Sequence, residues 1–406
     1  MTQSPVELTP EQVSDHVGGY TELRKQGPLA NVVLPGTVSP TWFVTHFEDI
    51  KALLTDTRFV RDHSKIPDVD IPHLGIEMLK AWDLPLEYGE YLTSLVVIDG
   101  PEHSRLRAKV IRTFSARRIN ALRPSVEQVA DTLLKELDGR DEIDLMADFA
   151  YPLANAAICD LIGVEEADQE KMRGWILQYV SGSEPVEIVA GLQGVVNYTK
   201  ELIQRRREAP TDDLISSMIA DHDPATEAEM IAMVFLLINT GHTPPVLFLC
   251  TALLALLDHP EQLARLRADH SLMPKAIHEL LRYTTPVTVG ATAYATEDLE
   301  FAGVQLKRGE SVTTAFLAAD HDPTRFAQPE RLDIDRAPSQ GEQHLAFGAG
   351  AHYCLGAALA RMQAEIALDR LLFRRDSVAL AVGRDELEYG SWPGDGTHLV
   401  RLPVRI

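Results

Sequence analysis

The chain has 406 residues, of which 45% are hydrophobic and 24% are charged, as in a typical globular protein. Its formal net charge of -22 argues against nucleic acids and anionic membranes as partners. The three cysteines lack the spacing of a disulfide framework, and the polar N-terminus has no apolar signal core. We therefore expect a cytoplasmic protein, since a reducing compartment keeps isolated cysteines as thiols.

The hydrophobic pattern predicts strands near both ends of the chain and helices between them. A long irregular stretch, 62–98, separates the first strands from the helices, and connections of this length are usually functional loops. A final helix, Leu355–Arg374, follows the last cysteine. We predict one mainly α domain with small β-sheets over 1–406, with β-rich portions at 31–60, 286–316 and 378–406 and a helical portion at 101–282.

The most apolar segment of the chain is Met230–Leu257. Thr226 and Glu229 ahead of it have the spacing of a capping box, which predicts the start of a helix. The polar and proline-containing run 239–245 interrupts the segment, so neither half reaches the ~20 apolar residues that a membrane span needs. A helix of the protein core is therefore expected here.

A glycine-rich run near the C-terminus presents a single cysteine. The run reads Phe-Gly-x-Gly-x-His-x-Cys-x-Gly and consists of Phe347, Gly348, Gly350, His352, Cys354 and Gly356. Glycines let a backbone approach a flat ligand, and loop N–H groups with a following helix favour a thiolate. Zinc would need further ligands at short spacing, whereas haem iron takes one thiolate from its protein. A buried cysteine in a glycine turn is the alternative.

On this run the chain resembles the soluble bacterial members of the cytochrome P450 family. The resemblance implies haem b held between a long central helix and the helix of the cysteine loop, with Cys354 ligating the iron and Phe347, Gly348 and Gly356 shaping the haem-binding loop. It implies a monooxygenase that uses dioxygen and two electrons from a ferredoxin-type donor and an NAD(P)H-dependent reductase. A monomer is expected. The alternative from another class is a haem sensor without turnover.

Two further segments agree with the resemblance. His103 and Arg107 lie four residues apart and share one helix face, and two donors on one face suit a carboxylate. In the family these positions and that of His352 bind the haem propionates; a solvated basic helix face is the alternative. The family often adds an arginine near the position of Ala293, but the window 286–297 has no cation, and the sequence names no replacement.

Glu279 and Arg282, three residues apart, can pair on one helix face. Together with Arg331 they resemble the Glu-Arg-Arg network that supports the cysteine loop in the family. Surface pairs of this kind are common and contribute little by themselves, so the interpretation depends on the cysteine run.

A local reversal of charge follows His103, because seven cations occur before Val126 without an acidic residue among them. The resemblance implies that an acidic ferredoxin docks on this side of the haem, and a solvated helix is the alternative. The cations are Arg105, Arg107, Lys109, Arg112, Arg117, Arg118 and Arg123.

The apolar segment departs from the family pattern after Gly241. The family places an acid and then an alcohol there to relay protons to dioxygen, but this chain has Thr243 and Pro244. The pair Pro244-Pro245 also predicts a kink, since each proline removes an N–H and costs roughly 3 kcal/mol in a helix interior. We interpret Gly241, Thr243 and Pro244 as the candidate catalytic segment, where the kink holds a water chain or leaves proton delivery to the substrate; a harmless kink is the alternative.

The segments 62–98 and 175–197 correspond to the variable regions that cover the substrate in the family. Small residues in the candidate pocket favour a bulky secondary metabolite, such as a macrolide or a modified peptide, although ordinary loop packing is the alternative. Hydroxylation is the default reaction, and the missing acid–alcohol pair favours oxidative decarboxylation, aromatisation, ring coupling or a peroxide-driven reaction as alternatives. The candidate pocket residues are Trp82, Tyr88, Val97, Trp175, Tyr179, Asn239, Val289, Gly290 and Ala291.

Overall fold

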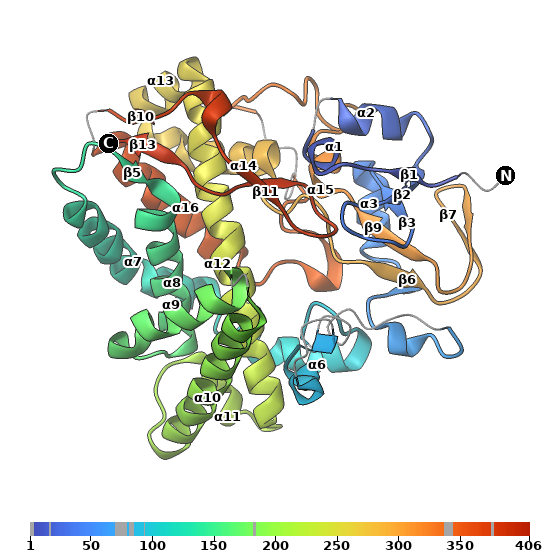
Figure 1. The fold of residues 1–406 in the computed structure, drawn as a ribbon, viewed down its shortest axis with the longest axis horizontal. Coiled ribbons are helices and arrows are strands. Elements are labelled where there is room, and N and C mark those ends of the chain that lie inside the picture. The colour runs from blue at the N-terminus through green and yellow to red at the C-terminus, as the bar shows by residue number, and fades with distance from the viewer. Residues whose placement is uncertain are drawn as a thin grey trace.

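The computed structural model describes residues 4–15, 18–69, 79–80, 85–92, 94–181, 184–336, 344–374 and 377–406. Helices make up most of the molecule, and the larger sheet lies to one side of them, near the N-terminus (Figure 1). The long helix α12 runs through the middle of the helical part. The predicted mainly α architecture with small β-sheets is therefore confirmed.

The helices form in the parts of the chain where apolar residues recur at helical spacing. In chain order they are α1 (Pro10–Ser14), α2 (Gly19–Arg24), α3 (Phe47–Leu53), α5 (Gly89–Leu92), α6 (Gly100–Ile111), α7 (Ala116–Glu136), α8 (Tyr151–Ile162), α9 (Glu166–Ser181), α10 (Pro185–Glu208), α11 (Leu214–Ile219), α12 (Glu227–Asp258), α13 (Pro260–Ala268), α14 (Met273–Thr284), α15 (Phe316–Asp320) and α16 (Ala357–Phe373). Short helical turns are η1 (His63–Lys65), η2 (Leu86–Tyr88), the π-helix η3 (Leu145–Ala150), η4 (His270–Leu272), η5 (Gly350–His352) and η6 (Arg384–Glu386).

The largest sheet has six strands in the order β1-β2-β3-β9-β6-β4, and it joins two of the three predicted β-rich portions, 31–60 and 286–316. Its strands are β1 (Val6–Glu7), β2 (Leu29–Val33), β3 (Thr41–Val44), β9 (Ser311–Thr314), β6 (Ala293–Ala295) and β4 (Phe59–Val60). A three-stranded sheet has the order β10 (Ala379–Leu380), β13 (Pro403–Arg405) and β5 (Ile143–Asp144). Two further sheets have two strands each: β11 (Tyr389–Ser391) pairs with β12 (Thr397–Leu399), and β7 (Leu299–Phe301) pairs with β8 (Val304–Leu306).

Helix α12 is the core element against which the others pack. It contacts α8, α10, α14 and α16 along its length, and most of its apolar side chains are buried. The predicted capping box is confirmed, since the Thr226 side chain accepts from the Glu229 N–H and the Glu229 carboxylate accepts from the Thr226 N–H at 2.8 Å. The polar and proline-containing run 239–245 does not end the helix, which continues through both prolines to Asp258.

Two apolar stretches, Leu145–Ile162 and Glu227–Asp258, are long enough to cross a membrane by length and composition. In their most apolar windows, 67% and 61% of the residues are buried inside the protein. Both stretches thus have the burial of core helices, which agrees with the interpretation of the apolar segment as a part of the protein core.

Candidate active site

The cysteine loop is shaped by glycines and ends at the start of α16. Gly348 and Gly350 have φ values of +67° and +69°, which side chains rarely adopt. A Cβ at Gly350 would also lie 2.4 Å from the Leu54 carbonyl oxygen. The Cys354 N–H donates to the Phe347 carbonyl at 3.0 Å, which closes the loop. The sulfur therefore stands just before the N-terminus of a 17-residue helix, where the helix dipole favours an anion.

Cys354 differs from the other two cysteines in its surroundings. Cys159 and Cys250 are buried in the core, and burial raises the pKa of the Cys159 thiol to about 12 and raises that of Cys250 as well. Cys354 is exposed and lines the cavity between α12 and the cysteine loop. Among the residues that the structure describes, no three His, Cys, Asp or Glu side chains gather as a metal site. A single thiolate ligand, as haem iron takes, fits this arrangement.

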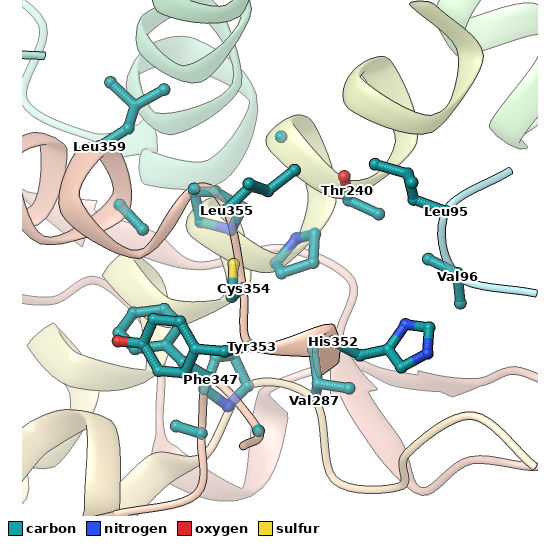
Figure 2. Close-up of a pocket in the computed structure, with 18 of the residues that line it drawn as sticks. Leu95, Val96, Thr240, Val287, Phe347, His352, Tyr353, Cys354, Leu355 and Leu359 are labelled. Carbon is teal, nitrogen blue, oxygen red and sulfur yellow. The ribbon is translucent and has the colours of Figure 1, made fainter. Parts of the chain in front are cut away.

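The cavity is lined mainly by apolar side chains from both sides of the fold. Figure 2 shows the Cys354 sulfur near its middle, with Thr240, Leu95 and Val96 to one side and Phe347 and Tyr353 to the other. The sequence-predicted residues that line it are Arg107, Gly241, Pro244, Gly290, Ala291, Phe347, Gly348, His352, Cys354 and Gly356. The fold thus brings together residues from α6, α12, the β6 side and the cysteine loop.

The predicted propionate partners also lie together. The rings of His103 and His352 are 4.2 Å apart, and the Arg107 guanidinium donates to the Tyr353 carbonyl at 2.6 Å. Burial, followed by the charges of His352 and Arg107, lowers the pKa of His103 to about 4. The His103 Nε2 atom is buried without a hydrogen-bond partner among the described residues. A buried ring nitrogen without a partner, beside the Arg107 guanidinium, suits a negatively charged group, so these residues fit haem carboxylates.

On the α12 side, Gly241 allows close helix packing. A Cβ at this position would meet the Ile158 Cδ1 atom of α8 at 2.8 Å. Pro244 and Pro245 line the cavity, whereas Thr243 is absent from its lining. The two prolines have no N–H groups to offer the carbonyls of Thr240 and Gly241, one turn before them.

Several predicted pocket residues lie elsewhere. Gly290 and Ala291 line the cavity, but Val97, Val289, Asn239, Tyr88, Trp175 and Tyr179 do not. The aromatic side chains pack within the helical part instead: Trp175 contacts Tyr198, and Tyr179 contacts Phe235. Trp82 lies outside the described residues. Aromatic content alone was a poor guide, because large rings are also favoured in helix packing.

A set of apolar residues in the cavity walls, and one cation, were not predicted from the sequence. Leu95 and Val96 end the variable stretch 62–98, and their apolar character beside the helix start was the available signal. Phe316 at the start of α15 depends on the tertiary fold and left no local signal. The missed residues include Leu54, Arg61, Leu95, Val96, Phe114, Leu236, Thr240, Val287 and Phe316.

The network behind the cysteine loop contains a different arginine from the predicted one. Glu279 and Arg282 form the expected buried pair, with 2.8 and 2.9 Å between donors and acceptors. Arg336 donates its Nε–H to both Glu279 oxygens, at 3.0 and 3.1 Å. The Arg331 side chain is exposed, and its carbonyl accepts from Arg282 and Arg336. The placement of the Arg331 guanidinium against Glu279 is therefore wrong, because the turn after Arg331 brings Arg336 to the carboxylate.

The cations after His103 are neutralised more than their local sequence suggests. Acidic residues from elsewhere in the chain pair with Arg105, Lys109, Arg112, Arg118 and Arg123. Lys109, for example, is only 3% exposed and contacts Asp221 and Asp223. Arg112, 68% exposed, and Arg117 remain accessible.

Comparison with known proteins agrees with the site. A family model for cytochrome P450 matches residues 172–376. Cytochrome P450 107B1 from Saccharopolyspora erythraea is 39% identical over 351 residues, covering 86% of this chain and 85% of that protein. The 6-deoxyerythronolide B hydroxylase of the same organism is 35% identical, covering 91% and 90%. The ligand-free structure of the P450 monooxygenase TamI has a TM-score of 0.87 at 33% identity, covering 99% of this chain and 94% of that one.

The chain therefore belongs to the cytochrome P450 family of monooxygenases. Within that family it resembles bacterial members, and its cofactor is haem b bound through a cysteine thiolate.

Proposed function

We propose that this protein hydroxylates a bulky secondary metabolite, such as a macrolide or a modified peptide, with Cys354 as the haem ligand. The observation that supports this most is the accessible cysteine facing an apolar cavity bounded by α12. When bound, haem supplies the reductive activation of dioxygen. The loop and the α16 dipole keep the sulfur ionised, and the apolar walls exclude water and orient the substrate.

We infer the size of the substrate from the relatives and from small residues in the cavity lining, more than from the volume of the cavity. The cavity has a volume of about 290 Å³, which is at the lower end for pockets that hold drug-sized ligands. Gly290 and Ala291 are small residues of the cavity lining, and one relative is named for hydroxylation of 6-deoxyerythronolide B.

The substrate proposal is tested with a panel of macrolides, modified peptides and small terpenes, measuring binding from the change in haem absorption. We expect the bulky compounds to bind more tightly and to gain one oxygen atom when ferredoxin, reductase and NAD(P)H are present. Ala291→Phe should weaken bulky ligands at least roughly tenfold, while Val38→Phe, at a 94% exposed position, should not. Tighter binding of the small terpenes would overturn the proposal.

A second candidate is an atypical reaction in which the substrate or bound water delivers the proton. It is favoured by the two prolines that line the cavity in place of an alcohol. The Thr240 hydroxyl, which also lines the cavity, donates to the Leu236 carbonyl at 2.7 Å, so its lone pairs are left to accept from water or substrate. Oxidative decarboxylation, aromatisation, ring coupling and peroxide-driven oxidation belong to this candidate.

The double variant Thr243→Glu/Pro244→Thr tests the second candidate by installing the acid and the alcohol. We expect no gain in the share of NAD(P)H consumed that appears as product, because proton delivery already has another route. A rise in both turnover and coupling with an unchanged product would show that the missing pair is merely a defect. Turnover with hydrogen peroxide alone would identify a peroxygenase, and absence of turnover in the haem-loaded protein would identify a sensor.

A further inference from the structure

The strand pair β4–β6 places Arg61 opposite Ala293, the position near which the family often has an arginine and this sequence has none. β4 and β6 are antiparallel, and Val60 lies opposite Tyr294. Continuing this register by one residue sets Arg61 opposite Ala293. Residues directly opposite each other on antiparallel strands project to the same face and lie close together. Arg61 therefore reaches the region that a side chain at position 293 would reach.

The surroundings of Arg61 connect it to the cavity. Arg61 lines the same cavity as Arg107 and His352. Its backbone N–H donates to the Asp99 carboxylate at 2.6 Å, and its guanidinium donates to the Val96 carbonyl at 3.2 Å. Burial lowers the pKa of Arg61 to about 10, although the charge of Asp99 opposes this shift. The guanidinium is thus still charged at neutral pH, with donors left for a further partner.

The nearby carboxylate is already occupied. Asp99 accepts from the Arg61 and Asp62 N–H groups and lies 3.3 Å from the His352 Nε2 atom. Within the described part of the chain, no carboxylate forms an ion pair with the Arg61 guanidinium. A partly buried cation without an anion is costly, so an anion from outside the chain would stabilise it.

We propose that Arg61 donates to a haem propionate and takes the place of the cation missing at Ala293. The proposal rests on the propionates lying beside His103, Arg107 and His352. Arg61 is then a positioning residue: it holds the cofactor and neutralises its charge across the strand pair, without contacting the reacting atoms.

The experiment moves the charge between the two strands in the haem-loaded enzyme. Arg61→Gln removes it, and Arg61→Ala/Ala293→Arg returns it from the opposite strand. Arg58→Gln is the matched control, since Arg58 is 45% exposed, pairs with Asp56 and does not line the cavity. The two readouts are the rate of haem transfer to an excess of apomyoglobin and the reduction potential of the iron.

We expect Arg61→Gln to lose haem roughly tenfold faster or more, the range for one charged hydrogen bond. It should also shift the potential downward, because an uncompensated propionate favours the ferric form. The double variant should restore both values towards wild type, and Arg58→Gln should change neither.

Wild-type haem transfer and potential in Arg61→Gln would overturn the proposal. Failure of the double variant to restore either value, in a protein with wild-type circular dichroism, would also contradict it. If Arg61→Gln weakens only ligands that carry a carboxylate, the residue binds substrate and not the cofactor. These readouts concern the haem alone, so they remain informative even if the proposed substrate class is wrong.

Discussion

The Glu279 carboxylate collects donors that lie far apart in the chain. Arg282 comes from the same helix, whereas Arg336 and the Asp333 N–H come from a segment more than fifty residues later. Glu279 and Arg282 are nearly inaccessible, so their charges depend on these contacts for compensation. The network ties α14 to the segment that leads into the cysteine loop.

The two arginines after Pro329 provide a direct comparison. Arg336→Ala should lower the free energy of unfolding by roughly 1.5–3 kcal/mol, the range for hydrogen bonds to a charged group. Arg331→Ala should change it by less than about 0.5 kcal/mol, because only its backbone takes part. Denaturant unfolding measures both values, and equal losses would contradict the assignment.

The pH dependence of the free energy of unfolding tests the burial of His344. Its side chain is 2% exposed, and burial, followed by the charge of His278, lowers its pKa to about 3. The unfolded chain takes up this proton near pH 6.5, so the folded protein loses stability as the pH falls from about 6.5 to 3. His344→Gln should flatten that part of the unfolding free energy curve, whereas His222→Gln, at a 94% exposed site, should follow wild type. An unchanged slope in His344→Gln would contradict this account.

At the scale of single residues, contacts between side chains that are close in the sequence could be predicted, whereas contacts between distant residues were missed. Glu279 and Arg282 were predictable because three residues along a helix fix their proximity. Arg336 and Arg61 were missed because their placement depends on a turn and on a strand register that local spacing does not determine. The choice of Trp175 and Tyr179 for the pocket failed for a similar reason, since helix packing turns them towards Tyr198 and Phe235.

Among the elements, α12 shows tertiary packing overriding a local helix breaker. Its 32 residues remain helical through Pro244 and Pro245, although each proline is unfavourable in a helix interior. Burial against α8, α14 and α16 offsets this cost. The carbonyls of Thr240 and Gly241, two residues that line the cavity, are then left without the usual helix donors.

Pro244→Ala tests whether these carbonyls matter for proton delivery. Restoring one N–H should raise the free energy of unfolding by roughly 1–3 kcal/mol. If the Thr240 carbonyl holds a water that delivers protons, the same variant should lower the coupling of NAD(P)H to product. Pro124→Ala in α7 is the matched control, because it removes an exposed helix proline away from the cavity. Unchanged coupling in Pro244→Ala would argue for a harmless substitution.

Across the whole molecule, the charge pattern of the sequence is altered by folding. The seven-cation segment suggested a strongly basic face, but five of its members pair with acids brought in by the fold. The architecture and the cysteine run were predictable because they depend on helical periodicity and on a contiguous motif. The surface potential depends on distant partners, which local sequence does not reveal.

Arg112, which is 68% exposed although it pairs with Asp221, and Arg117 are accessible members of that segment, and Arg107 of the same segment contacts the cysteine loop. If an acidic ferredoxin docks there, Arg112→Glu/Arg117→Glu should slow iron reduction roughly tenfold at low salt, with a smaller difference at high salt. Lys25→Glu, at the C-terminal cap of the distant helix α2, is the control, with a side chain that is 64% exposed. Stopped-flow reduction measures the rates, and an equal effect of all charge reversals would contradict a local docking surface.

The absorption spectrum of the reduced, carbon monoxide-bound protein tests the central claim most directly, since it reports whether a thiolate ligates the iron. We predict the thiolate signature in the wild type and in Cys159→Ala, whose substituted side chain is buried away from the cavity. Cys354→Ala should lose that signature. A wild-type spectrum without it, or its persistence in Cys354→Ala, would contradict the assignment of Cys354 as the haem ligand.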